Sequence, residues 1–303
     1  MSKDSSDEVV QQRPIKNEDL SGRFYEPLGS MPGPGVLVLH GSGTRDERGY
    51  TSRYARLLAH HGYAALDLEY FDTPETPPDL VEIPIEYFSR AIDWLTEQDI
   101  VQDGPVGSVA WSRGTEAQLL VVARDDRVGA VIAYSPSIYA FPGLPDNEPK
   151  DGEVSAWSHS GRPVPHVPPY EGVESDMDAP SGVRFRRTIE RAADDVRERA
   201  TIPLEGIEGP ILFVSGGDDI TWPADQFAET AIDRLAECDH PWHYEHHHHP
   251  DAGHAITSPY QPISAELVEM FGGSRVGNTQ AEADAWTHAL EYLRRGLRDR
   301  DNE

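Results

Sequence analysis

Short apolar runs that alternate with amphipathic segments constrain this chain more than any other feature of its sequence. Each apolar run has the length of a strand that is buried on both faces of a sheet. Such runs lie at residues 36–39, 63–68, 106–111, 128–134 and 211–214, and a further strand is expected at 242–246. Segments with the apolar spacing of a helix lie at residues 50–61, 85–98, 115–124, 224–237 and 279–297. Strands that alternate with helices form parallel sheets, so the sequence predicts an α/β fold with a mostly parallel central sheet flanked by helices.

One domain with an inserted segment accounts for this order. Residues 1–30 are polar and charged, and we expect them to be partly disordered, with one strand near Tyr25. Residues 31–303 are expected to form a single domain. Within it, residues 142–202 are rich in proline, glycine and acidic side chains, with one helix predicted at 183–199. A long irregular segment inside a compact domain is usually functional, so we interpret this insertion as a cap or lid.

Acidic side chains dominate the charge balance. The chain carries 53 Asp and Glu against 26 Lys and Arg, a formal net charge of −27. Nucleic acids are bound by clustered positive charge, so this balance excludes a nucleic-acid-binding protein. The acids are spread along the chain, as on a solvated surface, and the few lysines are Lys3, Lys16 and Lys150. Such a surface resembles that of proteins from salt-loving (halophilic) microbes, where salt screens the repulsion; an ordinary acidic protein is the alternative.

Targeting signals and cysteine content indicate a cytoplasmic protein that does not bind membranes. The N-terminal residues have no apolar run behind a basic start, so they do not predict a secretory signal. No stretch approaches the roughly 18 consecutive apolar residues that a membrane helix needs. Cys238 is the only cysteine, which excludes an intramolecular disulfide and fits a reducing compartment. The sequence leaves the oligomeric state open.

A strand that runs into a glycine-punctuated turn carries the first candidate for chemistry. Residues 106–111 are followed by Ser112, Arg113 and Gly114, and then by a predicted helix. A nucleophile on such a sharp turn projects from the carboxyl edge of the sheet, and the helix N-terminus beyond it favours a developing oxyanion. The pattern Ala-x-Ser-x-Gly departs from the usual Gly-x-Ser-x-Gly, but alanine is the next smallest residue. We predict Ser112 as a nucleophile; a serine that only caps the helix is the alternative.

A serine hydroxyl needs a neighbouring base, and both an acid and a histidine follow Ser112 in the chain. In the α/β-hydrolase fold the order is nucleophile, then Asp or Glu after a later strand, then His. Asp218 and Asp219 follow the strand at 211–214, and His254 follows the last strand signal. We predict Asp219 as the acid, with Asp218 as the alternative, and His254 as the base. An ordinary surface histidine is the alternative for His254.

Backbone donors for an oxyanion are expected from two segments. Residues 40–43 read His-Gly-Ser-Gly after the first buried strand, and glycines there allow N–H groups to face the site. We predict that the N–H of Ser42 or Gly43, together with the N–H of Arg113, forms the oxyanion hole; a plain turn is the alternative. Trp111 lies beside the nucleophile and is interpreted as a packing residue that could also contact substrate.

Four consecutive histidines form the tract His246–His249. Consecutive side chains alternate between the two faces of a strand, so these four do not converge on one ion without a turn. No cysteine or carboxylate lies at the spacing typical of a structural zinc site. We therefore expect neither a metal ion nor a cofactor.

The end of the chain resembles a known family. The matching residues are Asp218-Asp219-x-x-Trp222, Gly253-His254, Pro259-Tyr260, Gly272-Gly273, Asp284-Ala-Trp286 and, before the nucleophile strand, Glu86-Tyr87-Phe88. The span from about Gly35 to Leu297 resembles the C-terminal domain of the acyl-CoA thioesterase and bile-acid-CoA:amino-acid N-acyltransferase family, with dienelactone hydrolases as wider relatives. Family enzymes that act on acyl-CoA carry a β-sandwich domain before this one. About 30 residues precede the first core strand here, too few for that domain.

The resemblance implies an α/β-hydrolase fold and hydrolysis of a thioester or ester through Ser112, Asp219 and His254. Family members that conjugate amino acids carry cysteine at the position of Ser112, so serine implies transfer of the acyl group to water. The expected partner is a small-molecule acyl thioester of the acyl-CoA type, or an ester.

Two alternatives differ in substrate or in class. A dienelactone hydrolase-like or general carboxylesterase would act on a small non-CoA substrate, since a net charge of −27 repels polyanionic CoA. A local cluster could offset this repulsion, and the candidates are Arg184, Arg186, Arg187 and Arg191; solvated charges on a helix are the other interpretation. A binding protein that keeps the fold without activity is the second alternative.

Overall fold

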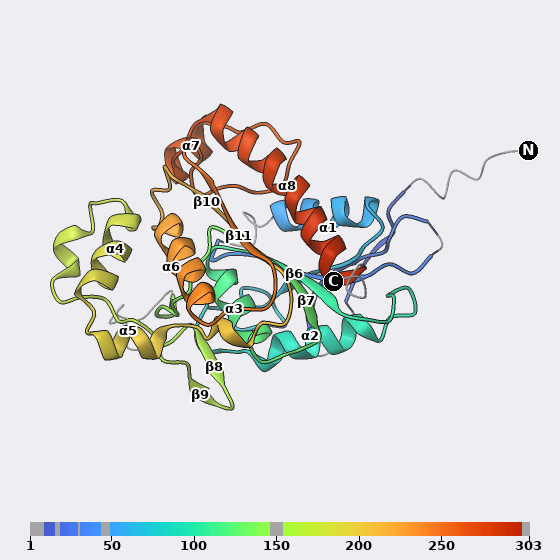
Figure 1. The fold of residues 1–303 in the computed structure, drawn as a ribbon, viewed down its shortest axis with the longest axis horizontal. Helices are drawn as coiled ribbons and strands as arrows, with labels where there is room; N and C mark the ends of the chain where they lie inside the picture. Colours follow the sequence, from blue (N-terminus) through green and yellow to red (C-terminus); the bar gives the residue numbers. More distant parts are fainter. Residues whose placement is uncertain (1–8, 16–18, 30, 44–48, 146–153, 299–303) are drawn as a thin grey trace, which may run out of the picture.

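The central sheet contains eight strands in the part of the chain that the structure describes. That part, in a computed structural model, comprises residues 9–15, 19–29, 31–43, 49–145 and 154–298. The strand order is β1-β2-β4-β3-β6-β7-β10-β11 (Figure 1). The bounds are β1 Gln12–Pro14, β2 Ser21–Tyr25, β3 Gly35–Leu39, β4 Ala64–Glu69, β6 Val106–Trp111, β7 Val128–Tyr134, β10 Ile211–Gly216 and β11 Tyr244–His249. The β1–β2 and β2–β4 pairs are antiparallel and the others are parallel, which confirms the predicted α/β fold.

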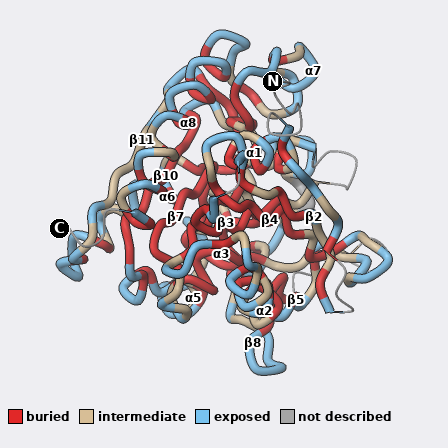
Figure 2. Tube along the Cα trace, turned by 90° about the vertical axis from the view of Figure 1, so that its right-hand side faces the viewer, coloured by how far each residue is buried: buried red, intermediate tan, exposed pale blue. Residues whose placement is uncertain are grey.

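Helices cover both faces of this sheet. The main ones are α1 Gly49–His60, α2 Glu86–Thr96, α3 Arg113–Val122, α6 Ala224–Glu237 and α8 Arg275–Leu297. α1 and α8 pack on one face, and α2, α3 and α6 on the other (Figure 1). Each face has its own apolar core, around Tyr54 and Trp286 on the first and around Phe88 and Phe227 on the second. The buried strands therefore lie in the middle of the molecule (Figure 2).

The positions of the buried residues in a helix depend on which of its sides are covered by other elements. In α2 the buried residues recur every three or four positions, as expected for a helix with one face on a sheet: Tyr87, Phe88, Ala91, Ile92 and Leu95. Every residue of α3 is buried instead. The outer side of α3 is covered by the insertion, since Glu116 of α3 accepts a hydrogen bond from Trp157.

The sheet extends on the N-terminal side of the boundary expected at residue 31. β2 pairs with β4 from Ser21 opposite Glu69 to Tyr25 opposite Ala65, and β1 pairs with β2. The strand expected near Tyr25 is thus β2, whereas β1 is short and polar and has no apolar signal in the sequence. Residues 1–8, 16–18 and 30 lie outside the described residues, and the boundary at residue 31 stays a prediction.

The insertion contains more regular structure than the sequence indicates. β8 pairs with β5 on one side and with β9 on the other, and four helical segments follow within or just after the insertion. Residues 146–153 lie outside the described part. The bounds are β5 Ile83–Pro84, β8 Trp157–His159, β9 Arg162–Pro163, η3 Val173–Asp176, α4 Ser181–Arg191, α5 Asp194–Ala200 and η4 Leu204–Gly206.

The single helix predicted at 183–199 is wrong, because α4 and α5 are separate helices. Ala192 and Ala193 between them are extended, with ψ angles of 137° and 147°. Asp194 and Asp195 occupy the first turn of α5, where negative charge stabilises the start of a new helix. The acidic pair therefore marks a helix start that apolar periodicity alone does not reveal.

A short helix, α7 (Ala265–Phe271), precedes α8 in the C-terminal part of the fold. Ser264 caps α7 by accepting a hydrogen bond from the N–H of Leu267. In the described residues, no helix combines the length and the apolar character needed to cross a membrane.

Candidate active site

Ser112 lies on a strained turn between β6 and α3. Its φ and ψ angles are 52° and −126°, a conformation that few residues other than glycine adopt. The turn is held because Ser112 donates its N–H to Tyr134 O (2.9 Å) on the neighbouring strand. Gly114 allows a close approach, since a Cβ there would lie 2.1 Å from the His40 carbonyl oxygen. The side chain of Ser112 makes no capping hydrogen bond to α3, which argues against the helix-cap alternative.

The hydroxyl of Ser112 contacts the predicted histidine, which in turn contacts the predicted acid. His254 Nε2 lies 2.9 Å from Ser112 Oγ, and His254 Nδ1 lies 2.7 Å from Asp219 Oδ2. The side chains of His254 and Asp219 are 9% and 2% exposed. With a neutral ring, Nδ1–H donates to the carboxylate and Nε2 accepts the hydroxyl proton. This arrangement can move a proton from the serine to the histidine.

The two neighbouring acids, Asp218 and Asp219, have different contacts. Asp219 Oδ1 accepts hydrogen bonds from the N–H groups of Thr221 (2.8 Å) and Trp222 (3.2 Å), which fixes the carboxylate against the ring of His254. Asp218 Oδ2 accepts from Gly273 N–H (3.1 Å) instead. Of the two candidates that the sequence offered, Asp219 is therefore the one beside His254.

The loop that carries His254 is held by a residue that sequence analysis missed. Ser135, directly after β7, donates its hydroxyl to the carbonyl of His254 (2.8 Å). The carbonyl of Ser135 accepts from Trp222 Nε1 (3.0 Å), and the indole lies edge-on to the imidazole. The Asp-x-x-Trp motif signalled Trp222, but the only sign of Ser135 was its place after a strand. On the other side, His254 donates its N–H to Phe271 O (2.8 Å).

The segment His40–Gly43, predicted to contribute to an oxyanion hole, lies next to the nucleophile. A Cβ at Gly41 would be 3.1 Å from the Cβ of Ser112, a tight contact that would require Ser112 to shift by a few tenths of an ångström. Gly41 N–H donates to the hydroxyl of Tyr50 (2.9 Å). Ser42 and Gly43 come next in the chain, and Arg113 begins α3, where no helical acceptor exists for its N–H. The donor roles of Ser42, Gly43 and Arg113 stay predictions.

The ring of His40 packs against Tyr70 and contacts the main chain of this segment. It stacks on the ring of Tyr70 with a centroid distance of 4.1 Å, and its Nδ1 lies 2.6 Å from Gly41 O. Its Nε2 lies 3.5 Å from a carboxylate oxygen of Glu69. These contacts give His40 a structural role in shaping the turn.

Trp111 packs inside the protein. Its side chain is 3% exposed, it stacks on Tyr134 with a centroid distance of 4.9 Å, and its Nε1 donates to Ile256 O (2.8 Å). Of the two roles left open for Trp111, these contacts favour packing. The bond to Ile256 also links the nucleophile strand to the segment that follows His254.

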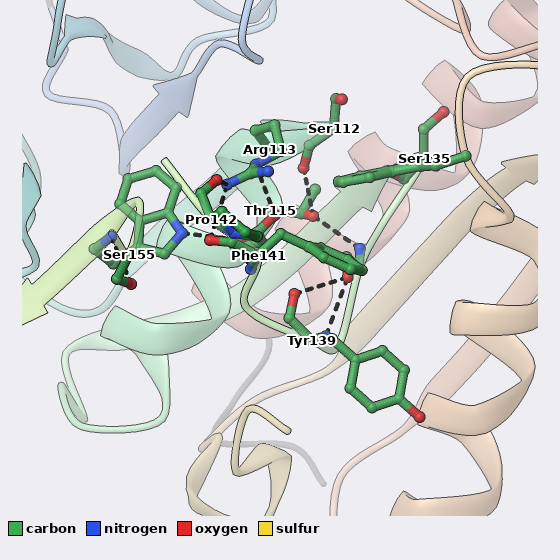
Figure 3. A network of polar contacts seen from close by, with 12 residues as sticks. Ser112, Arg113, Thr115, Ser135, Tyr139, Phe141, Pro142 and Ser155 are labelled. Carbon is green, nitrogen blue, oxygen red and sulfur yellow. Dashed lines mark hydrogen bonds and ion pairs between the residues drawn. The ribbon is translucent and has the colours of Figure 1, made fainter. Parts of the chain in front are cut away.

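Arg113, the residue after Ser112, belongs to a buried ion pair, and its side chain lies beside Phe141 and Pro142 (Figure 3). Arg113 Nε is 2.8 Å from Glu116 Oε1, and both side chains are at most 5% exposed. The Arg113 guanidinium also donates to the carbonyls of Phe141 (3.2 Å) and Pro142 (2.8 Å). Glu116 Oε2 accepts from Trp157 Nε1 (2.8 Å) and from Phe141 N–H (3.1 Å). The pair thus joins the start of α3 to both ends of the segment 141–157.

Burial raises the pKa of Glu116 to about 7, and the guanidinium of Arg113 opposes that rise. The sequence indicated a role only for the main-chain N–H of Arg113 and none for Glu116. The available signal was an i,i+3 pair of opposite charges in a helix with no other charged residue.

The arginines of α4 already have partners in the protein. Arg187 forms an ion pair with Asp176, and Arg191 lies 4.6 Å from the ring centroid of Tyr170. Arg184 donates to Met177 O (3.0 Å), and Arg186 donates to the side chain of Gln226 (3.4 Å) on α6. These contacts anchor the charged helix to its surroundings.

The residues with metal-ligand spacing lie elsewhere in the described structure. One ligand atom from each of His247, Asp284 and His288 lies within 4.8 Å of the others. None of these residues contacts Ser112, Asp219 or His254 through a hydrogen bond in the described part of the chain.

The sheet order and the turn at Ser112 define the class of protein, an α/β-hydrolase fold. Residues 83–299 match the sequence model described as "BAAT / Acyl-CoA thioester hydrolase C terminal", and the chain belongs to this family. The resemblance found in the C-terminal motifs is thereby confirmed.

Curated relatives include two CoA thioesterases and an acyltransferase. The peroxisomal succinyl-coenzyme A thioesterase of Mus musculus is 25% identical over 295 residues, covering 95% of this chain and 66% of the relative. Acyl-coenzyme A thioesterase 6 of Homo sapiens is 24% identical, with coverage of 95% and 66%. The bile acid-CoA:amino acid N-acyltransferase of Mus musculus is 26% identical, with coverage of 93% and 64%. The chain thus spans just under two thirds of the length of these relatives.

Solved structures show the same fold. A dienelactone hydrolase-like promiscuous phosphotriesterase from metagenomic libraries superposes with a TM-score of 0.57 at 16% identity, covering 95% of this chain and 99% of that one. A putative dienelactone hydrolase from Klebsiella pneumoniae gives a TM-score of 0.55 at 14% identity, with coverage of 94% and 98%. At these identities the likeness concerns the fold alone.

Proposed function

We propose that this protein is a serine hydrolase that cleaves an acyl thioester of the acyl-CoA type, with Ser112, His254 and Asp219 as its catalytic triad. The observation that carries the proposal is the position of the His254 ring, with one nitrogen 2.9 Å from Ser112 Oγ and the other 2.7 Å from Asp219 Oδ2. Membership of the thioester hydrolase family supports the choice of a thioester.

The reaction proceeds by two acyl transfers. His254 takes the hydroxyl proton as Ser112 Oγ attacks the thioester carbonyl carbon, and Asp219 stabilises the imidazolium that forms. The main-chain N–H of Arg113 and that of Ser42 or Gly43 donate to the oxyanion. The carbon–sulfur bond then breaks, and the thiol leaves with the proton from His254. Finally His254 deprotonates a water molecule, which attacks the acyl-Ser112 ester and releases the acid and the free hydroxyl.

Water is the proposed acceptor of the acyl group. The family includes relatives described as N-acyltransferases as well as thioesterases. Family members that conjugate amino acids resemble thiol enzymes, with cysteine at the position of the nucleophile. This chain has Ser112 at that position. The proposal therefore places the protein among the hydrolases of the family.

Replacement of the nucleophile tests the mechanism. In Ser112→Ala, kcat for acyl-CoA thioesters and p-nitrophenyl esters should fall by about 10⁵-fold, because the remaining groups cannot form an acyl-enzyme. Ser160→Ala changes an exposed serine of the insertion and should leave turnover unchanged. Turnover by Ser112→Ala within about tenfold of the unmodified protein would sink the assignment.

A carboxylesterase of dienelactone hydrolase type is the second candidate. The contacts of Arg187 and Arg191 with Asp176 and Tyr170 favour it, because these positive charges are already engaged within the protein. The net charge of −27 opposes a polyanionic leaving group in the same way. A panel of acyl-CoA thioesters and short esters at low and high salt separates the two candidates. Hydrolysis of esters alone at both salt concentrations would favour the esterase.

A further inference from the structure

The histidine tract 246–249 lies along the edge strand β11, and its side chains divide between two environments. His246 Nε2 and His248 Nδ1 lie 2.7 Å and 3.5 Å from the hydroxyl of Ser215 on β10. His247 and His249, two residues apart, both approach Asp284 on α8. Alternation along a strand thus places one pair of histidines against the helix.

α8 presents two potential ligands to that pair. Asp284 and His288 are four residues apart and therefore share one side of the helix. Asp284 Oδ2 lies 3.9 Å from His247 Nδ1, 3.7 Å from His249 Nε2 and 3.6 Å from His288 Nδ1. Three imidazoles from two elements thus surround one carboxylate oxygen.

These separations suit a small divalent ion. Tetrahedral ligands that bind Zn²⁺ at about 2.0–2.1 Å lie roughly 3.4 Å from one another, and each of the three nitrogens lies within about half an ångström of that separation from Asp284 Oδ2. One ligand atom from each of His247, Asp284 and His288 lies within 4.8 Å of the other two. His249 lies outside this group of three, so its ring would have to turn toward the other imidazoles to become the fourth ligand. A set of three nitrogens and one oxygen favours Zn²⁺ and similar transition metals over Mg²⁺ and Ca²⁺, which prefer oxygen.

A second carboxylate orients one of the imidazoles. Glu245 Oε2 lies 3.0 Å from His247 Nε2, so a proton on Nε2 leaves Nδ1 to face Asp284. The same Glu245 oxygen accepts from the hydroxyl of Tyr292 (3.0 Å), which is also on α8. A carboxylate that accepts from the far nitrogen of a histidine is the usual outer support of a metal ligand.

We propose that His247, His249, Asp284 and His288 form a binding site for one divalent transition-metal ion of the Zn²⁺ class. The ion would join β11 to α8 by four bonds. The proposal departs from the expectation that no metal binds: the four histidines of the tract need not all face one ion, because α8 supplies the other ligands. The proposal is independent of the proposed hydrolase activity.

A binding titration with matched variants tests the site. The full chain is stripped with EDTA, dialysed, and titrated with ZnCl₂ against a chromophoric zinc chelator, with MgCl₂ in excess to occupy surface carboxylates. We expect the unmodified protein and His248→Gln to bind one equivalent. His248 is exposed and belongs to the same tract, but it faces Ser215. His249→Gln and His288→Gln should each weaken binding by at least about tenfold, since losing a ligand costs more than losing its support.

Thermal unfolding gives a second readout. Zinc should raise the Tm of the unmodified protein and of His248→Gln, but not that of His249→Gln, because an ion that binds only the folded state stabilises it. If His249→Gln unfolds without metal, Asp284→Asn and His288→Gln, on the partly exposed face of α8, replace it. Equal zinc affinity in every variant, or loss of all binding in excess Mg²⁺, would overturn the proposal and indicate adsorption to surface carboxylates.

Discussion

Two regions meet at Ser112: the loops that carry Asp219 and His254, called the C-terminal loops below, and the insertion. They are fixed in partly different ways. Main-chain hydrogen bonds hold the C-terminal loops together, among them Asp218 N–H to Ala252 O (2.9 Å) and His254 N–H to Phe271 O (2.8 Å). Glycine allows these contacts, since a Cβ at Gly253 would lie 2.3 Å from the carbonyl of Gly272. The geometry around His254 therefore depends on how closely three backbones approach.

The start of the insertion has main-chain hydrogen bonds too, among them Ala156 N–H to Phe141 O (3.3 Å), and is held in addition by two buried charged side chains. Arg113 donates hydrogen bonds to the carbonyls of Phe141 and Pro142 (Figure 3). Glu116, on the same helix, accepts from Trp157 Nε1 and from Phe141 N–H. Loss of one side chain should disturb the loops around His254 less than loss of one partner of the buried ion pair disturbs the start of the insertion. Substitutions in each region should therefore differ in whether they remove activity or stability.

The largest effect is expected in the C-terminal loops, on activity. Asp219→Asn should lower kcat by about 10⁴-fold, because the amide favours the wrong tautomer of His254 and cannot stabilise the imidazolium. The fold should persist, since Asn keeps an acceptor for the N–H groups of Thr221 and Trp222. Steady-state kinetics and thermal unfolding measure both quantities.

Asp218→Asn is the matched control for this prediction. Asp218 accepts from Gly273 and does not contact His254, so kcat should change by less than about tenfold. A loss in Asp218→Asn as large as that in Asp219→Asn would contradict the assignment of the acid.

The next effect is expected in the insertion, on stability. Glu116→Ala should lower the free energy of unfolding by about 3–5 kcal/mol, because it leaves the buried Arg113 guanidinium without its carboxylate. Urea unfolding at constant pH measures the change. In the double variant Arg113→Met, Glu116→Leu, most of the loss should be recovered, since apolar residues can replace a buried ion pair. A single variant within about 1 kcal/mol of the unmodified protein would show that the insertion has other anchors.

The smallest effect is expected on the pH dependence of stability. It involves Glu282, which contacts Thr257 in the segment after His254. Glu282 on α8 accepts from Thr257 N–H (3.1 Å) and Oγ1 (2.8 Å), and burial raises its pKa to about 7. Below about pH 4.5 the carboxyl is protonated in both the folded and the unfolded chain. Between there and pH 7 only the folded chain keeps the proton, so this group lowers stability as the pH rises.

Glu282→Gln should remove this contribution. Relative to the unmodified protein, the variant should gain on the order of 2 kcal/mol of stability between pH 4.5 and pH 7.5, with Glu116 as a second source of the same trend. Unfolding free energies at a series of pH values measure the difference. If Glu282→Gln left the pH dependence of the unfolding free energy unchanged, another group would be responsible for it. Asp67 is one such group, since burial raises its pKa to about 6.

The residues of the candidate site that follow strand ends could be predicted from the sequence. β6, β7 and β10 are mostly apolar and fully buried; Ser112 comes directly after β6, and Asp219 comes three residues after the end of β10. Chain order and the C-terminal motifs then located His254. Because short turns connect these residues to the ends of predicted strands, their place at the edge of the sheet follows from the strand prediction.

Contacts between distant, irregular segments could not be predicted. Glu116 and Trp157 are 41 residues apart, and no periodicity relates them. The grouping of His247 and His249 with Asp284 depends on how β11 and α8 pack, which neither local pattern encodes. β1 is too short and too polar to give a strand signal. Long-range pairing of short elements requires the three-dimensional structure.

The two outermost strands of the sheet bear on how copies of this protein behave at high concentration. Unpaired main-chain groups on an outer strand can template strand addition between molecules and so begin aggregation. β1, at one margin, is three residues long and ends in Pro14, which has no N–H to offer. β11, at the other, carries Glu245 and four bulky polar imidazoles. Both margins of the sheet therefore discourage the growth of a shared sheet between neighbouring molecules.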